Sequence, residues 1–124
     1  MENQERVESN PLIRSTIDEK EATPLPDNFV PGELDVKSGR GKGNWAHKGN
    51  QDFRRVICSN LTRFESATTK VERSTIVESV LHDLRERGVY FVKHTKKDGW
   101  FDVGNRQAKD KISTSFRYYS KRKR

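Results

Sequence analysis

The sequence predicts a small α+β domain with the element order strand, helix, helix, β-hairpin, helix, preceded by a disordered acidic N-terminal tail. Apolar residues recur at helical spacing in three segments, and an Asp98-Gly99 turn signal lies between two runs rich in aromatic and β-branched residues. Acidic and basic residues are also segregated along the chain, which separates the tail from the domain. At 124 residues, the chain has room for one domain of ordinary size.

The predicted tail covers residues 1–33. It contains all four prolines, and its three cations and eight acidic residues give it a net charge of −5. The rest of the chain has 22 cations and 10 acidic residues, a net charge of +12. The tail shows no sustained apolar period of 3.6 or 2, so we expect it to be disordered. A basic α+β domain over residues 34–120 and a basic C-terminal run over residues 121–124 complete the predicted organisation.

A short strand over Leu34–Lys37 leads into two predicted helices. The first runs from Gln51 to Glu65 with Asn50 as its cap. The second follows a capping box formed by Thr69 and Glu72 and ends at Gly88. The predicted buried residues are Phe53, Val56, Ile57, Leu61 and Phe64 in the first helix and Ile76, Val77, Val80, Leu81 and Leu84 in the second.

The predicted hairpin joins Val89–His94 to Trp100–Val103. A loop of two or four residues places Tyr90, Val92, His94, Phe101 and Val103 on one face, and Phe91, Lys93, Trp100 and Asp102 on the other. The first face is the better core face. A last helix, capped by Asn105, buries Ala108, Ile112, Phe116 and Tyr119. A strand, two helices and a hairpin wing also match much of a winged-helix fold, as an analogy of element order.

A glycine-rich stretch, Leu34–Phe53, is the most distinctive part of the sequence. Bare backbone N–H groups and cations in such a loop can hold a phosphate; alternatively, the glycines only form a tight turn. We favour a functional role for Arg40 and Lys42, because a structural turn has no need of two cations. The stretch fits neither the P-loop nor the GxGxxG pattern. The residues expected to shape the loop are Gly39, Gly41, Gly43, His47, Gly49 and Asn50.

The residue inventory disfavours several function classes. A single cysteine, Cys58, forms no intramolecular disulfide and suits a reducing compartment. The apolar runs are too short for a membrane span or a signal peptide, so we expect a soluble intracellular protein. The three histidines and Cys58 lack zinc-ligand spacing, and the carboxylates form no recognisable pair or triad. We therefore expect no metal, no cofactor and no enzymatic activity.

The order of several motifs resembles an uncharacterised domain expanded in diatoms and related algae. The matching motifs are a Gly39-Arg40-Gly41 turn, His47-Lys48-Gly49-Asn50 followed by Phe53, an aromatic hairpin with Tyr90, Phe91 and Trp100, and a final helix with Ala108 and Lys111. The resemblance covers about residues 34–119. Family members tend to have a cysteine or a similar small residue where this chain has Ser38, so the resemblance implies no required thiol there. It implies no particular activity.

The positive domain points to a nucleic-acid-binding function, with duplex DNA slightly preferred over RNA and a nuclear location over a cytoplasmic one. Trp45 is the candidate for stacking or groove contact. The predicted contact residues are Arg40, Lys42, Trp45, Lys48, Arg54, Lys96, Lys97, Arg106, Lys109, Lys121 and Arg122. Two alternatives stay open: a protein-interaction module that docks an acidic partner or its own acidic tail, and a sensor or enzyme for phosphorylated small molecules.

Overall fold

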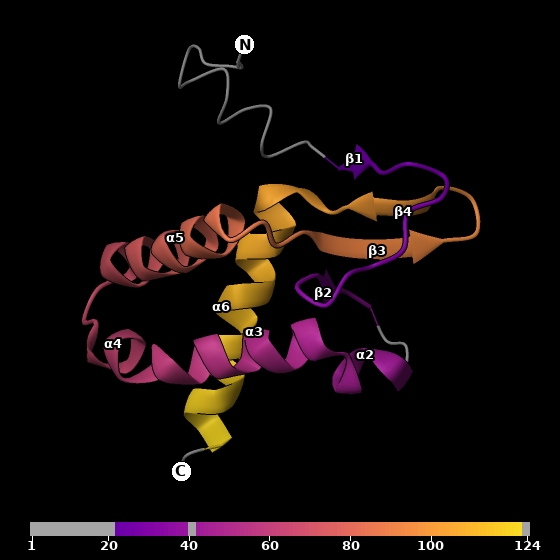
Figure 1. The fold of residues 1–124 in the computed structure, drawn as a ribbon. Helices are drawn as coiled ribbons and strands as arrows, with labels where there is room; N and C mark the ends of the chain where they lie inside the picture. Colours follow the sequence, from indigo (N-terminus) through magenta and orange to yellow (C-terminus); the bar gives the residue numbers. More distant parts are fainter. Residues whose placement is uncertain (1–21, 40–41, 123–124) are drawn as a thin grey trace, which may run out of the picture.

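The chain folds as a mixed four-stranded sheet with helices packed on one face (Figure 1). The structure is a computed structural model that describes residues 22–39 and 42–122. The strands are β1 (Thr23–Pro24), β2 (Val36–Lys37), β3 (Phe91–Thr95) and β4 (Gly99–Asp102). The helices are α2 (Lys42–Ala46), α3 (Lys48–Ser59), α4 (Leu61–Ser66), α5 (Lys70–Glu86) and α6 (Gly104–Arg122). The predicted α+β class and the single domain are confirmed.

The sheet has the strand order β1-β4-β3-β2. Strand β2 runs parallel to β3, because α3, α4 and α5 form the crossover between them, while β3 and β4 form the antiparallel hairpin. At the outer edge, Thr23 and Pro24 pair with Asp102 and Phe101 of β4. Residues 22–33 were expected in the disordered tail, but here they belong to the sheet and its connections; residues 1–21 lie outside the described residues.

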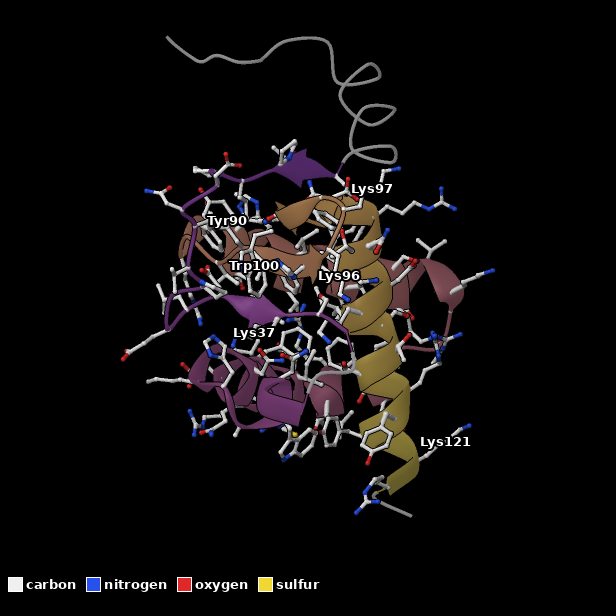
Figure 2. The ribbon with its side chains drawn as sticks, turned by 90° about the vertical axis from the view of Figure 1, so that its right-hand side faces the viewer. Lys37, Tyr90, Lys96, Lys97, Trp100 and Lys121 are labelled. Atoms are coloured by element: carbon white, nitrogen blue, oxygen red, sulfur yellow. The ribbon has the colours of Figure 1, made fainter. Side chains whose placement is uncertain are left out.

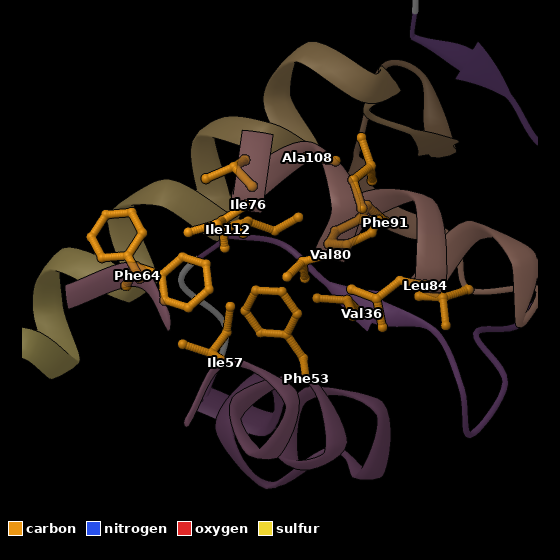
Figure 3. Packing of buried hydrophobic residues seen from close by; sticks show 14 of the residues in the cluster. Val36, Phe53, Ile57, Phe64, Ile76, Val80, Leu84, Phe91, Ala108 and Ile112 are labelled. Carbon is orange, nitrogen blue, oxygen red and sulfur yellow. The ribbon is translucent and has the colours of Figure 1, made fainter. Parts of the chain in front are cut away.

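One hydrophobic core lies between the sheet and the helices (Figure 3). Val36 and Phe91 of the sheet meet Phe53 and Ile57 of α3, with the Phe53 and Phe91 ring centroids 5.9 Å apart. Helix α6 packs against α3, α4 and α5 and contributes the predicted stripe of Ala108, Ile112 and Phe116. The apolar periods in the sequence thus identify the buried faces of α3, α5 and α6, because each helix covers the core with one side.

The predicted first helix is in fact two helices. It begins at Lys48, three residues before the predicted start, and breaks at Asn60. The Asn60 side chain donates a hydrogen bond to the Val56 carbonyl and accepts one from Arg63, and such local bonds compete with a continuous helix. Asn50 was expected to cap this helix, but it lies within α3 and is buried.

Helix α5 agrees with its prediction in both its start and its end. The Thr69 hydroxyl accepts the Glu72 N–H, and the Glu72 carboxylate accepts the Thr69 N–H, so the capping box is present. Gly88 stops the helix with φ +85°. The last helix differs at its start: Asp102 Oδ1, not Asn105, accepts the Gly104 N–H, and Asn105 bonds Arg85 instead.

The facial assignment of the hairpin is wrong in the sequence prediction. The turn between Thr95 and Gly99 has three residues, with Gly99 at φ +69°, so Val92 pairs with Asp102 and His94 with Trp100. An odd loop shifts the register by one residue relative to a loop of two or four. Phe91 therefore faces the helices, while Val92 is buried on the opposite face and Tyr90 is exposed.

Candidate nucleic-acid interface

The glycine-rich stretch folds as a short turn followed by helix. Gly39 has φ +109°, whereas Gly43 lies in α2 and Gly49 in α3. Where the sequence allowed an extended phosphate-binding loop, most of the described residues of the stretch are thus helical. Arg40, Gly41 and the side chain of Lys42 lie outside the described residues, so their predicted contacts stay predictions.

Three residues of this stretch hold α3 against the sheet. A Cβ on Gly49 would overlap the backbone carbonyl of Asp35, so only glycine permits this approach. The Asn50 amide accepts the Lys37 N–H at 2.8 Å and donates to the Lys37 carbonyl at 2.9 Å, which satisfies the free edge of β2. His47 Nε2 lies 3.0 Å from the Gly32 carbonyl. These contacts give His47, Gly49 and Asn50 a structural explanation.

The most unusual surface feature is Trp45, which is 63% exposed on α2. The Arg54 guanidinium lies 3.6 Å from the centroid of the indole. Arg54 also donates a hydrogen bond of 2.8 Å to the Trp45 carbonyl, so the cation is fixed over one face of the ring. Stacking of a guanidinium on an indole is favourable, and here Trp45 stays exposed while Arg54 is half-buried. Two predicted contact residues are therefore brought together.

Residues of α6 extend this feature across the molecule. Lys111 Nζ lies 5.7 Å from the centroid of the Phe53 ring, and Arg122 stacks at the same distance over Tyr118. Tyr118 in turn packs edge-to-face on Tyr119, with centroids 4.9 Å apart. We call this set the Trp45 surface. It consists of Trp45, Arg54, Lys111, Tyr118, Tyr119 and Arg122.

Electrostatic effects connect the two halves of the Trp45 surface. Burial, and after it the charge of Arg54, lowers the pKa of Lys111. Burial raises the pKa of Tyr119, while the charges of Arg54 and Arg122 act in the opposite direction. Arg54 of α3 is thus an electrostatic neighbour of α6. Lys111 and Tyr118 were not among the predicted contact residues, although Lys111, Tyr118 and Arg122 recur at helical spacing beside the buried stripe.

The remaining predicted contacts lie elsewhere or are already paired. Lys48 forms an ion pair with Asp52 at 2.8 Å, and Lys109 lies 3.9 Å from Glu78. Lys109 also lines a groove of about 800 Å³ between α4, α5 and α6, and Arg106 precedes it by three residues on the same side of α6. The Trp45 surface lies on a different side of α6.

Lys96 and Lys97 are exposed at the hairpin turn, which Figure 1 shows at the same end of the molecule as α2. Figure 2 shows both lysines well separated from Lys121 near the end of α6. Trp100 is partly covered, with the Phe29 centroid at 6.1 Å and the His94 centroid at 5.1 Å. The cations that the structure describes therefore do not form one continuous patch, and only those of the Trp45 surface accompany an exposed indole.

Outside the Trp45 surface, residues 22–39 and 42–122 contain a polar cluster around Asp102. That part of the chain has no group of three or more histidine, cysteine, aspartate or glutamate side chains arranged to hold a metal ion. None of its helices is long and apolar enough to cross a membrane. Buried Asp102 serves the fold: it accepts two hydrogen bonds from Arg85, at 2.7 and 2.9 Å, and one from Gly104.

Comparison with known families places residues 35–118 within one family model, described as a domain of unknown function (DUF6824). The matched range begins at the buried Asp35 beside β2 and ends in the last turns of α6, so it includes β2 through β4 and every described helix. Comparisons with curated proteins and with solved structures give no match.

Proposed function

The chain belongs to the DUF6824 family, and we propose that its domain binds nucleic acid through the Trp45 surface. The observation that carries the proposal is the exposed indole of Trp45 under the guanidinium of Arg54, whose helix α3 packs against α6 next to Lys111. Aromatic rings interleaved with cations are typical of surfaces that contact both the bases and the phosphates of nucleic acid.

Net charge supports the same proposal. Residues 34–124 have a net charge of +12, and a basic domain attracts a polyphosphate over long range. We propose that Arg54 and Arg122 contact phosphates at the Trp45 surface, and that Lys121, next to Arg122 in the chain, contacts a ligand that continues along α6. The predicted contacts of Arg40 and Lys42 would extend the Trp45 surface at the start of α2, and Lys96 and Lys97 would contact a ligand that reaches the hairpin turn.

Several finer points belong to the proposal as well. We keep DNA as the slightly preferred nucleic acid, although charge by itself attracts duplexes and single strands of DNA and RNA alike. A nuclear location rests on the basic run at residues 121–124. The relationship to an algal expansion of the family rests on the order of the motifs. We propose a binding role without catalysis.

The test is a salt titration of binding. The affinity of the full chain for a labelled oligonucleotide is measured by fluorescence anisotropy. We expect the logarithm of the binding constant to fall linearly with the logarithm of the salt concentration, with a slope of about 0.7 to 0.9 per phosphate contact. Arg54→Gln should reduce that slope by about 1 unit. Arg117→Gln is the matched control, because Arg117 is an exposed cation of α6 bonded to Ser113. A flat salt response, or equal losses in the two variants, would contradict the proposal.

A second candidate function is docking of an acidic protein segment. It is favoured by an apolar groove of about 280 Å³ between α3 and the α5–β3 connection, lined by Val36, Phe53 and Leu84, with Arg55 and Arg87 among its lining residues. An additional arm of the same experiment separates the candidates. Removal of residues 1–21, which include six acidic residues, should strengthen oligonucleotide binding under the first proposal, but weaken self-association under the second.

A further inference from the structure

Trp45 is held in an exposed position by its neighbours. The residue is 63% exposed, although burial of a large aromatic side chain is normally strongly favourable. The Arg54 guanidinium covers one face at 3.6 Å and is itself held by the Trp45 carbonyl. Because the ring is exposed and already fixed, stacking of a planar ligand on it costs the protein little conformational entropy.

A second stacked pair lies on the same surface. Tyr118 is 49% exposed, with the Arg122 guanidinium 5.7 Å from its ring centroid. The two pairs lie on neighbouring helices, because Lys111 Nζ of α6 is 5.7 Å from the ring centroid of Phe53, the residue before Arg54 in α3. Tyr119 of α6 packs on Tyr118. Two aromatic rings, each with an arginine, thus occur on one surface. A repeated pair of this kind fits successive planar groups joined by an anionic backbone.

Trp100, the second tryptophan, packs against other aromatic residues of the fold. Trp100 packs edge-on against Phe29 and His94, and its backbone carbonyl accepts the Leu25 N–H. Trp45 has no such apolar cover among the ring contacts of the described residues. Packing therefore explains Trp100, whereas the exposure of Trp45 points to an external partner.

The ligand must offer a base with a free face, on which an aromatic side chain can stack. Within a duplex, both faces of an internal base are occupied by its stacked neighbours, so a side chain can stack only on an unpaired base or at an end. Trp45 lies on the five-residue helix α2, at the surface of the molecule. We infer that the Trp45 surface binds unpaired nucleotides, with one base stacked on Trp45, another on Tyr118, and the phosphates between them near Arg54 and Arg122. This inference rests on the proposed function and specifies its ligand class.

The first experiment compares two probes at one salt concentration. Full-length protein is titrated with labelled oligo-dT of 15 nucleotides and with a labelled blunt 15-base-pair duplex. We expect the single strand to bind about tenfold more tightly. Trp45→Ala should weaken oligo-dT binding about tenfold and duplex binding less than about twofold, whereas Trp45→Phe should retain most of the affinity because a ring remains. Circular dichroism melting of each variant checks that it is folded.

The second experiment observes the stacking directly. In a Trp100→Phe background, Trp45 is the remaining tryptophan, and its fluorescence should be quenched by oligo-dT but hardly by the duplex. Equal affinities for both probes, or equal losses for both in Trp45→Ala, would overturn this inference and leave nucleic-acid binding intact. Absence of salt-dependent binding to either probe would overturn both proposals.

Discussion

Gly49 is the residue at which helix α3 touches the backbone of the sheet. In the sequence it looks like one of several glycines of a flexible loop, but the structure places it in a helix directly against Asp35. The same turn of α3 contains Asn50, whose amide pairs with both backbone groups of Lys37. Glycine is required here for close approach, not for an unusual φ angle.

We predict that Gly49→Ala lowers the free energy of unfolding by about 1–3 kcal/mol or more, because the added methyl group would force α3 away from β2. Urea denaturation followed by circular dichroism measures the change. Gly43→Ala is the matched control: it lies in α2, and a Cβ there meets no other group within 4 Å. That control should be neutral or slightly stabilising, since alanine favours helix. Equal destabilisation in both variants would argue against the contact.

At the scale of elements, the capping box of α5 is a local device that the sequence predicted fully. All its donors and acceptors lie between Thr68 and Glu72, so no distant contact is needed. Hydrogen bonds from the Thr68 N–H, and after it from the Thr68 hydroxyl and the Thr69 N–H, lower the pKa of Glu72 below its ordinary value of 4.5. A lowered pKa means that the ionised carboxylate stabilises the folded state.

The stability contributed by Glu72 should be present above its unfolded pKa and be lost as pH falls through the lower folded value. We predict that Glu72→Gln lowers the melting temperature at pH 7, and that the difference from the parent protein shrinks below about pH 4. Thermal melts at several pH values follow this difference. Asp83→Asn, at an exposed carboxylate of the same helix, should change the melt at pH 7 much less. A difference independent of pH would contradict the role of the charge.

The hairpin shows how a local signal can be right about an element and wrong about its faces. Asp98-Gly99 predicted the turn correctly, but the choice of loop length depended on the register with β4. The register places Phe91 against Phe53 of α3, which only the packed structure specifies. A one-residue change in loop length would move every side chain of a strand to the other face.

At the scale of the whole molecule, the segment that follows β1, residues 25–34, lies over the sheet face opposite the helices. Its Phe29 ring packs on Trp100 and on Tyr90, with a centroid distance of 6.3 Å to Tyr90, and Leu25 bonds the Trp100 carbonyl. On this face Val92 is fully buried. The segment thus completes the fold, although its proline content and acidity had suggested disorder.

We predict that Phe29→Ala destabilises the domain by about 1–2 kcal/mol, because the ring is partly buried. In a Trp45→Phe background, the emission of Trp100 should shift to longer wavelength as its cover is removed. Val30→Ala is the neighbouring control, since Val30 is 77% exposed. An unchanged Trp100 emission in Phe29→Ala would mean that the segment does not cover this face.

The sequence by itself determined α5, α6 and the two hairpin strands, the capping box, the Gly88 stop and the buried helical stripes, because these depend on local spacing and local hydrogen bonds. It did not predict β1, α2 or the break between α3 and α4. The tertiary structure decided the rest. It assigned Gly49 and Asn50 to the edge of β2, and it selected the buried face of the hairpin. It also brought Arg54 to Trp45 and near α6. All three outcomes depend on contacts between different elements of the fold. Such contacts have no period in the sequence, so only the packing of α3 and α6 on the sheet defines them.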